Sequence, residues 1–179
     1  MGKTLYQQAS YPSRLHSAWA VIRHNGSVSS SPGTRRAIEQ YSKSARQNID
    51  SIYRGLLHRE YTFQPATGIA LTREGKDPRP LVVAEIPDRI VQRSLLDRIQ
   101  GIPAVRKAIA HEGSYGAIQK RGVRDAITKA ITTQSGGGNH YLRSDIKGFF
   151  NRIPRLDALS QLAKVLPDSS LNDILEAAT

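Results

Sequence analysis

The longest periodic segment of the chain runs from about residue 34 to residue 58 and predicts an amphipathic helix. Its apolar positions recur at spacings of three and four residues: Ile38, Tyr41, Ala45, Ile49, Ile52, Tyr53 and Leu56. The opposite face carries the cations Arg35, Arg36, Lys43, Arg46 and Arg54. A charged face is usually only solvated, but one with its cations on one side of the helix could also follow a nucleic-acid backbone.

A second apolar helical face precedes this segment, between Arg14 and Arg23, and we interpret it as core. Its members are Leu15, Ala18, Trp19 and Ile22. Between the two helices, residues 25–33 are rich in Ser and Gly and predict a loop. At the end of this loop Gly33 permits close approach of the backbone to a ligand, although a flexible connector explains the same composition equally well.

Two runs of alternating apolar residues predict a β-hairpin. Residues 69–71 and 81–83 flank Glu74-Gly75-Lys76-Asp77, which has the composition of a turn. Arg73, Lys76 and Arg79 lie on this hairpin. A flexible hairpin that carries cations can close on a triphosphate and stabilise the charge that develops on its oxygens.

A further helix begins at Pro87 and Asp88, because Pro is favoured in the first turn and an acidic side chain is favoured at the positive end of a helix. Its apolar face is formed by Ile90, Val91, Leu95 and Ile99. We favour a packing role for this segment over a chemical one.

Small residues and cations follow. Gly113-Ser114-Tyr115-Gly116 reads as a loop, and Lys120, Arg121 and Arg124 lead into a helix whose inner face we expect to contain Ala126, Ile127, Ala130 and Ile131. The three cations are candidates for phosphate contacts, since a charged N-terminal segment that faces solvent otherwise has no explanation.

The stretch from Tyr141 to Phe150 predicts a short strand that ends on Asp145, after a flexible turn at residues 135–139. A carboxylate at a strand end can hold a hard cation such as Mg²⁺, which prefers oxygen ligands and is usually shared with substrate phosphates. An Asp in this position is, however, more often a turn residue or a cap. Beyond it, residues 153–166 have helical periodicity and should pack under the sheet, Pro167 ends that helix, and a last helix should begin near residues 169–170.

Four of these segments follow one another in a specific order: Arg79-Pro80-Leu81, residues 87–92, residues 113–116 and residues 145–150. In that order and with those gaps the chain resembles the fingers and early palm of bacterial reverse transcriptases of the group II intron, retron and defence-associated kind. The resemblance covers roughly residues 15 to 160. Four motifs in register are far more specific than any one of them.

The resemblance implies roles for individual residues. Arg79 matches the Arg that contacts the phosphates of the incoming nucleotide, and Arg73 and Lys76 compete for the role of an upstream Lys. Tyr115 and Gly116 belong to a loop near template and nucleotide, and Gly33 to a loop near the template. Phe150 matches the aromatic residue that rejects a ribose 2′-hydroxyl by steric clash and so favours deoxynucleotides.

The resemblance also implies a magnesium site. Nucleotide addition in this family uses two Mg²⁺ ions roughly 4 Å apart. Asp145 matches the first metal ligand, and the backbone carbonyl of Ile146 would be another. The pair of Asp residues that the family carries in a later Tyr-x-Asp-Asp hairpin is absent from this sequence. We therefore expect the chain to be a piece that lacks the rest of the palm and the thumb, which a later segment or a second chain would supply.

The charge of the chain agrees with a nucleic-acid partner. Twenty-six Lys and Arg against 15 Asp and Glu leave a formal net charge of +11. Such an excess destabilises a compact state unless a polyanion neutralises it. The absence of Cys excludes disulfides and thiolate metal sites, and no apolar run approaches the roughly 18 residues of a membrane span. We expect a cytoplasmic protein without membrane contact.

Together these observations predict an α+β fold with helix-rich fingers, a β-hairpin and the start of a polymerase palm sheet. The expected divisions are 1–33 (N-terminal helix and loop), 34–135 (fingers with early palm elements) and 136–179 (first catalytic palm strand and following helices). The expected function is that of an RNA-directed DNA polymerase fragment, which binds RNA template, RNA/DNA duplex and dNTP but does not polymerise alone. An exposed sheet edge would favour self-association.

Two other functions fit the same motifs. One is a non-catalytic, maturase-like module that binds RNA, and the other is a phage-defence polymerase that works without a template. An intact Asp145 and Phe150 argue against the first, because a scaffold needs neither a metal ligand nor a sugar gate. The sequence does not separate the second from ordinary copying.

Overall fold

The computed structural model describes residues 2–118, 120–146 and 149–179, and describes only the backbone at residues 71, 73, 76, 77, 79, 150 and 151. Helices and a two-stranded antiparallel sheet make up the regular structure of these residues, so the expected α+β class is confirmed. None of the described helices is long and apolar enough to cross a membrane.

The chain forms two compact units. The first contains Met1–Ile99 together with Pro167–Thr179, and the second contains Gln100–Leu166. These units follow from packing, whereas the expected ranges 1–33, 34–135 and 136–179 divide the chain by polymerase function. The functional division therefore stays a prediction.

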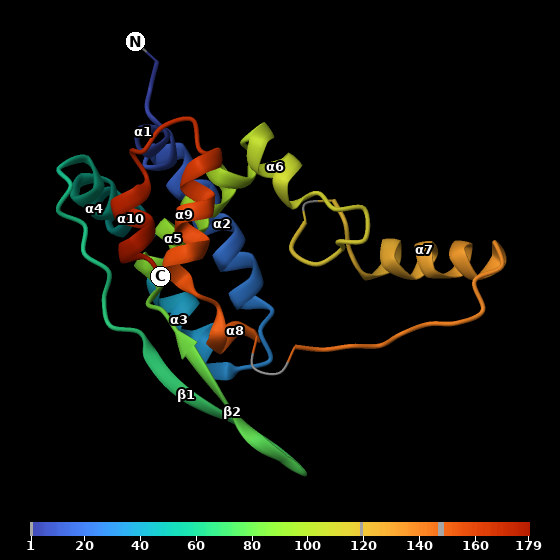
Figure 1. The fold of residues 1–179 in the computed structure, drawn as a ribbon. Coiled ribbons are helices and arrows are strands. Elements are labelled where there is room, and N and C mark those ends of the chain that lie inside the picture. The colour runs from blue at the N-terminus through green and yellow to red at the C-terminus, as the bar shows by residue number, and fades with distance from the viewer. Residues whose placement is uncertain (1, 119, 147–148) are drawn as a thin grey trace. The chain divides into compact units, whose positions relative to one another are not determined.

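The first unit is a group of helices with a hairpin that extends from it (Figure 1). Its helices are α1 (Leu5–Ala9), α2 (Pro12–Ser27), α3 (Pro32–Ser42), α4 (Ala45–Leu57), α5 (Ile86–Gln100) and α10 (Asn172–Ala177). All four residues expected on the apolar face of α2 are buried, and so are Ile38, Ile49, Ile52 and Leu56 of the following helices.

The expected loop at residues 25–33 is shorter than predicted, because α2 continues to Ser27 and α3 already begins at Pro32. Gly26 lies in the last turn of the extended helix. A Cβ atom at Gly26 would lie 2.4 Å from Cγ1 of Ile38, so only glycine lets this turn of α2 approach α3 so closely. The close approach leaves Ile38 only 3% exposed.

The single helix expected at residues 34–58 is wrong, since α3 ends at Ser42 and α4 begins at Ala45. The Ser42 hydroxyl donates to the carbonyl oxygen of Ile38 at 2.7 Å, an interaction that often bends a helix. Ser44 then leaves the helical conformation with φ −127°. The break lets α3 and α4 each contact α2.

The predicted hairpin is confirmed. Strand β1 (Thr67–Arg73) pairs with β2 (Lys76–Val83), and Ile69 lies opposite Leu81. Gly75 has φ +68° in the turn, a conformation that glycine adopts without strain. The turn occupies fewer residues than expected, because Lys76 already pairs with Arg73.

The C-terminal segment packs against the N-terminus. The carboxylate of Asp168 accepts a hydrogen bond from the backbone N–H of Leu5 at 3.0 Å, and the Ser170 hydroxyl accepts one from the N–H of Tyr6 at 3.0 Å. A hydrogen bond from Ser170 holds the pKa of Asp168 below its usual value. The last helix, α10, begins later than expected because residues 168 and 170 hold the start of α1 instead.

The second unit contains α6 (Pro103–Ile109), α7 (Val123–Ser135), α8 (Phe149–Arg152) and α9 (Arg155–Val165). The prediction that Ala126, Ile127, Ala130 and Ile131 lie on a buried face is wrong, because α7 buries none of its residues. Ile127 and Ile131 are more than half exposed. Periodicity identified the helix correctly but not whether another element covers it.

The strand expected to end on Asp145 does not form in the described residues. Residues 139–146 have no regular structure, and the side chains of Tyr141 and Leu142 are 94% and 93% exposed. A strand needs a hydrogen-bonding neighbour, and the only described sheet consists of β1 and β2. The described residues therefore contain no palm sheet under which α9 could pack as the sequence predicts.

Candidate nucleic-acid interface

The predicted nucleotide-binding cations of the hairpin flank its turn. Arg73 and Lys76 are direct partners across the strands, and Arg79 pairs with Leu71. The two candidates for the upstream cation therefore occupy adjoining backbone positions. Their side chains, and that of Arg79, lie outside the described residues.

The first turns of α3 carry Gly33, Arg35 and Arg36. A Cβ atom built on Gly33 would meet only the Ser31 hydroxyl, at 3.7 Å, so the backbone here faces open space. The Arg35 guanidinium donates to the carbonyl oxygen of Ser29 and holds the connection before α3. Arg36 is exposed and makes no ion pair among the described residues, so its charge is available to a polyanion.

In the second unit, Arg121 organises the loop that contains Tyr115 and Gly116. Its Nη1 donates to the carbonyl oxygens of His111 and Ser114 at 2.7 and 3.0 Å. Tyr115 is partly buried, and a Cβ atom on Gly116 would meet nothing within 4 Å. Arg121, predicted as a phosphate contact, thus has a positioning role that the sequence did not indicate.

Lys120 and Arg124 differ from Arg121 because both are exposed and make no ion pair among the described residues. Lys120 has a backbone φ of +63°, and Arg124 lies in the first turn of α7. These two side chains keep the freedom that a phosphate contact requires.

This difference predicts distinct effects of two matched substitutions. If Arg124 contacts a phosphate as the sequence predicts, Arg124→Gln should lower the slope of log affinity against log salt for duplex nucleic acid by about 0.9. It should leave the melting temperature unchanged. Arg121→Gln should also lower the melting temperature of the second unit, because two loop carbonyls lose their donor.

Fluorescence anisotropy at several salt concentrations measures the slope, and circular dichroism measures the melting temperature. Equal slopes for wild type and Arg124→Gln would remove Arg124 from the interface. Equal melting temperatures for the two variants would contradict the positioning role of Arg121.

Asp145 and Ile146 lie together on an exposed, irregular segment. Within the described residues no three His, Cys, Asp or Glu side chains gather into a group that could hold a metal ion. Asp145 alone does not fit a two-ion site, so further carboxylates would have to come from elsewhere. Phe150 lies in α8, and its side chain is outside the described residues.

Asp88 is the one acidic side chain that is fully buried among the described residues. It is 1% exposed and lies in the first turn of α5, where it accepts hydrogen bonds from the Tyr61 hydroxyl at 2.7 Å and from the Gln64 N–H at 3.0 Å. Burial raises the pKa of Tyr61, and Asp88 raises it further, so this hydroxyl stays a donor. Asp88 therefore ties residues 61–64 to α5, in agreement with the packing role favoured from the sequence.

The sequence did not reveal the partners of Asp88. Tyr61 lies 27 residues before Asp88, in a segment without period, and no local pattern connects the two residues. A buried carboxylate with two donors is a structural element that only the folded chain displays.

Comparison with known proteins gives one distant similarity and no family assignment. The chain is 26% identical over 130 residues to an uncharacterized 91 kDa protein in a cob intron of Schizosaccharomyces pombe. The match covers 73% of this chain but only 16% of that protein. No protein-family model matches the sequence. The chain therefore has a distant, intron-associated relative.

Proposed function

We propose that the chain forms the fingers and first palm portion of an intron-associated RNA-directed DNA polymerase. The observation that carries this proposal is the similarity to a protein in a cob intron, in a chain whose motifs follow the order of reverse transcriptases. The formal net charge of +11 supports a polyanionic partner. Because this relative is a protein in an intron, we favour an intron-associated reverse transcriptase over a phage-defence one.

In this proposal each part of the chain has one task. Arg79, with Arg73 or Lys76, binds the phosphates of a dNTP, and Phe150 lies under its sugar. Gly33, Tyr115 and Gly116 approach the RNA template. Arg36, Lys120 and Arg124 contact the phosphates of the RNA/DNA duplex through charge-assisted hydrogen bonds.

The proposed magnesium site needs more than this chain's described residues provide. Asp145 and the carbonyl of Ile146 would be two ligands, and Mg²⁺ would stabilise the attacking and leaving oxygens when bound. The remaining carboxylates would come from a further segment of the same protein or from a second chain. We accordingly propose that residues 1–179 bind nucleic acid and do not synthesise DNA alone.

A non-catalytic RNA-binding module is the second candidate. The observation that favours it is that no three His, Cys, Asp or Glu side chains of the described residues gather into a group that could hold a metal ion around Asp145. Both candidates bind RNA, so binding alone does not distinguish them. Only incorporation of nucleotides does.

The deciding experiment is primer extension by the full product of the gene that encodes this chain, on an RNA template with Mg²⁺ and dNTPs. Extension that depends on the template supports the polymerase. Extension without a template would support the defence-type activity. Absence of extension by a folded product that still binds RNA would favour the non-catalytic module.

The proposed sugar gate gives a separate prediction. Phe150→Ala should raise the use of rNTPs relative to dNTPs by about 5- to 150-fold, because removal of a clash with one oxygen is worth ~1–3 kcal/mol. Primer extension with each nucleotide set measures the ratio. Phe149→Ala, at the neighbouring position, is the matched control and should leave the ratio unchanged. The same rise in both variants would contradict the assignment.

A further inference from the structure

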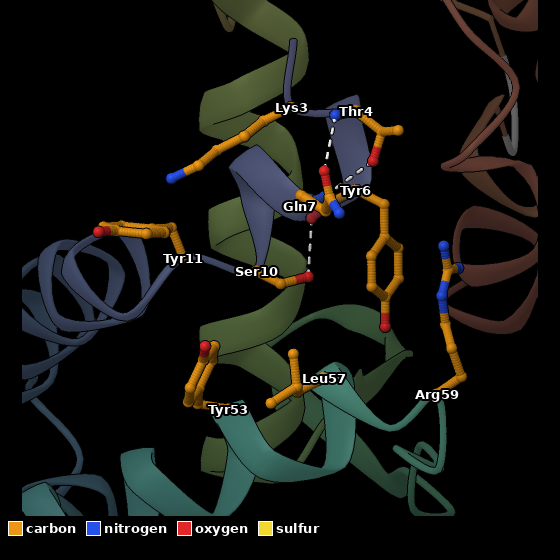
Figure 2. Close-up of a pocket in the computed structure, with 9 residues that line it drawn as sticks. All are labelled: Lys3, Thr4, Tyr6, Gln7, Ser10, Tyr11, Tyr53, Leu57 and Arg59. Atoms are coloured by element: carbon orange, nitrogen blue, oxygen red, sulfur yellow. Dashed lines mark hydrogen bonds between the residues drawn. The ribbon is translucent and has the colours of Figure 1, made fainter. Parts of the chain in front are cut away.

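A pocket of about 410 Å³ lies between α1 and the second half of α4, within the first unit (Figure 2). Its lining residues are Lys3, Thr4, Tyr6, Gln7, Ser10, Tyr11, Tyr53, Leu57 and Arg59. None of them has a part in the proposed polymerase. The volume falls in the range of pockets that hold a small organic ligand.

The pocket exposes aromatic surface. Tyr11 is 49% exposed and Tyr53 is partly exposed, and Figure 2 shows both side chains at the border of the same hollow. Leu57, 58% exposed, adds an apolar side chain between them and Tyr6. Such surfaces attract planar, apolar groups, since an aromatic ring stacks on them without a fixed hydrogen-bond pattern.

Two cations complete the pocket. Nζ of Lys3 lies 4.2 Å from the centroid of the Tyr11 ring, and Cζ of Arg59 lies 3.4 Å from that of Tyr6. The Tyr6 hydroxyl donates to the carbonyl of Leu56 at 2.7 Å, which fixes the ring under Arg59. Neither cation makes an ion pair among the described residues, and no Asp or Glu lines the pocket.

The Gln7 amide adds a neutral hydrogen-bond donor to the pocket. Oε1 of Gln7 accepts from the N–H of Thr4 at 3.0 Å, and the Thr4 hydroxyl accepts from the N–H of Gln7. This reciprocal cap orients the Gln7 amide and leaves its Nε2 without a partner in the described part of the chain. The pocket thus combines aromatic rings, two cations and an amide donor.

Planar rings beside unpaired cations suit a ligand that is both aromatic and anionic. A nucleotide has these two properties. A base inside a duplex cannot enter, because both of its faces are stacked on neighbours. We propose that this pocket binds one unpaired nucleotide of a single-stranded RNA. Its base contacts Tyr11 and Tyr53, and its phosphates contact Lys3 and Arg59.

The test compares a labelled 12-nucleotide single-stranded RNA with a blunt RNA duplex of the same length, by fluorescence anisotropy with the full chain. Tyr11→Ala and Tyr53→Ala should each lower the affinity for the single strand by about 5- to 30-fold and leave the duplex affinity unchanged. Tyr11→Phe and Tyr53→Phe keep the rings and should restore binding. Lys3→Gln should lower the salt slope for the single strand by about 0.7.

A second measurement detects the contact directly. RNA that contains 4-thiouridine should crosslink, on irradiation, to peptides that include Tyr11 or Tyr53. Unchanged affinity in both Ala variants with crosslinks confined to other peptides would overturn the proposal. So would an equal loss of affinity for the duplex, which would indicate a structural role, or tighter binding of free AMP or UMP than of the RNA.

These outcomes are independent of polymerase activity. The readout is binding, and the pocket shares no residue with the proposed catalytic parts. Failure of primer extension would therefore leave the pocket intact. Failure of the tyrosine variants to weaken binding would leave the polymerase proposal intact.

Discussion

Asp88→Ala should lower the free energy of unfolding of the first unit by about 3 kcal/mol, because it removes a buried carboxylate and leaves its donors unpaired. The Tyr61 hydroxyl and the Gln64 N–H would both lose their acceptor. The favourable interaction of the negative charge with the start of α5 would also be lost. The side chain is 1% exposed, so water does not replace these partners without rearrangement.

Urea unfolding followed by the fluorescence of Trp19, the only Trp of the chain and a core residue, measures this effect. Asp97→Ala is the matched control. It also removes an acidic side chain from α5, but Asp97 is partly exposed and pairs with Arg93 at 2.9 Å on the helix surface, so the cost should stay below about 1 kcal/mol. Equal midpoints for Asp88→Ala and Asp97→Ala would show that the Asp88 contacts do not stabilise the unit.

Two tyrosines refine this test. Tyr61→Phe removes one of the two donors to Asp88 and should cost about 1 kcal/mol. Tyr41→Phe should instead be neutral or stabilising, because the Tyr41 hydroxyl is buried without a hydrogen-bond partner in the described residues. Burial also raises the pKa of Tyr41 to about 12. Opposite signs for two chemically identical substitutions would show that hydrogen-bond partnership, and not ring polarity, decides stability here.

Asp145→Ala should reduce dNTP incorporation by the full gene product by at least about 1000-fold, which corresponds to ~4 kcal/mol of lost transition-state stabilisation. In the proposed function this carboxylate is a magnesium ligand, and the described residues hold no group of three potential metal ligands that could take its place. The affinity for RNA should change by less than about twofold, since the substitution removes no cation.

Asp157→Ala is the control, because Asp157 is an exposed residue in the first turn of α9 and has no assigned role. Single-turnover primer extension measures incorporation, and anisotropy measures RNA affinity. Full activity in Asp145→Ala would overturn its catalytic role. Equal loss in Asp157→Ala would indicate that the region tolerates no substitution and that the assay does not report on the metal site.

The sequence predicted much of the first unit because its signals are local. The apolar positions of α2 and the acidic start of α5 depend on residues within a few turns, and Gly75 directs the hairpin turn within four residues. These elements formed as expected. The break between α3 and α4 was missed, since one apolar period continues across it and only the separate contacts of the two helices with α2 require a bend.

For the candidate site, the sequence identified which residues are cations but not which of them are engaged in contacts within the chain. Arg36, Lys120 and Arg124 are exposed and their phosphate contacts stay predictions, whereas Arg121 donates to two loop carbonyls. The pocket between α1 and α4 was not predicted at all. It joins residues 3–11 with residues 53–59, and no short motif marks such a pairing.

By itself the sequence determined where most helices of the first unit lie, the hairpin, the α+β class and the strongly basic character, because propensity, periodicity and charge are properties of neighbouring residues. Which of the apolar faces are buried became visible in the folded chain alone. The apolar positions of α2 became core, those of α7 stayed exposed, and the expected strand before Asp145 formed no pairs. Burial and strand pairing depend on residues that are distant in the chain. A local sequence pattern does not show whether such residues pack against a helix or pair with a strand.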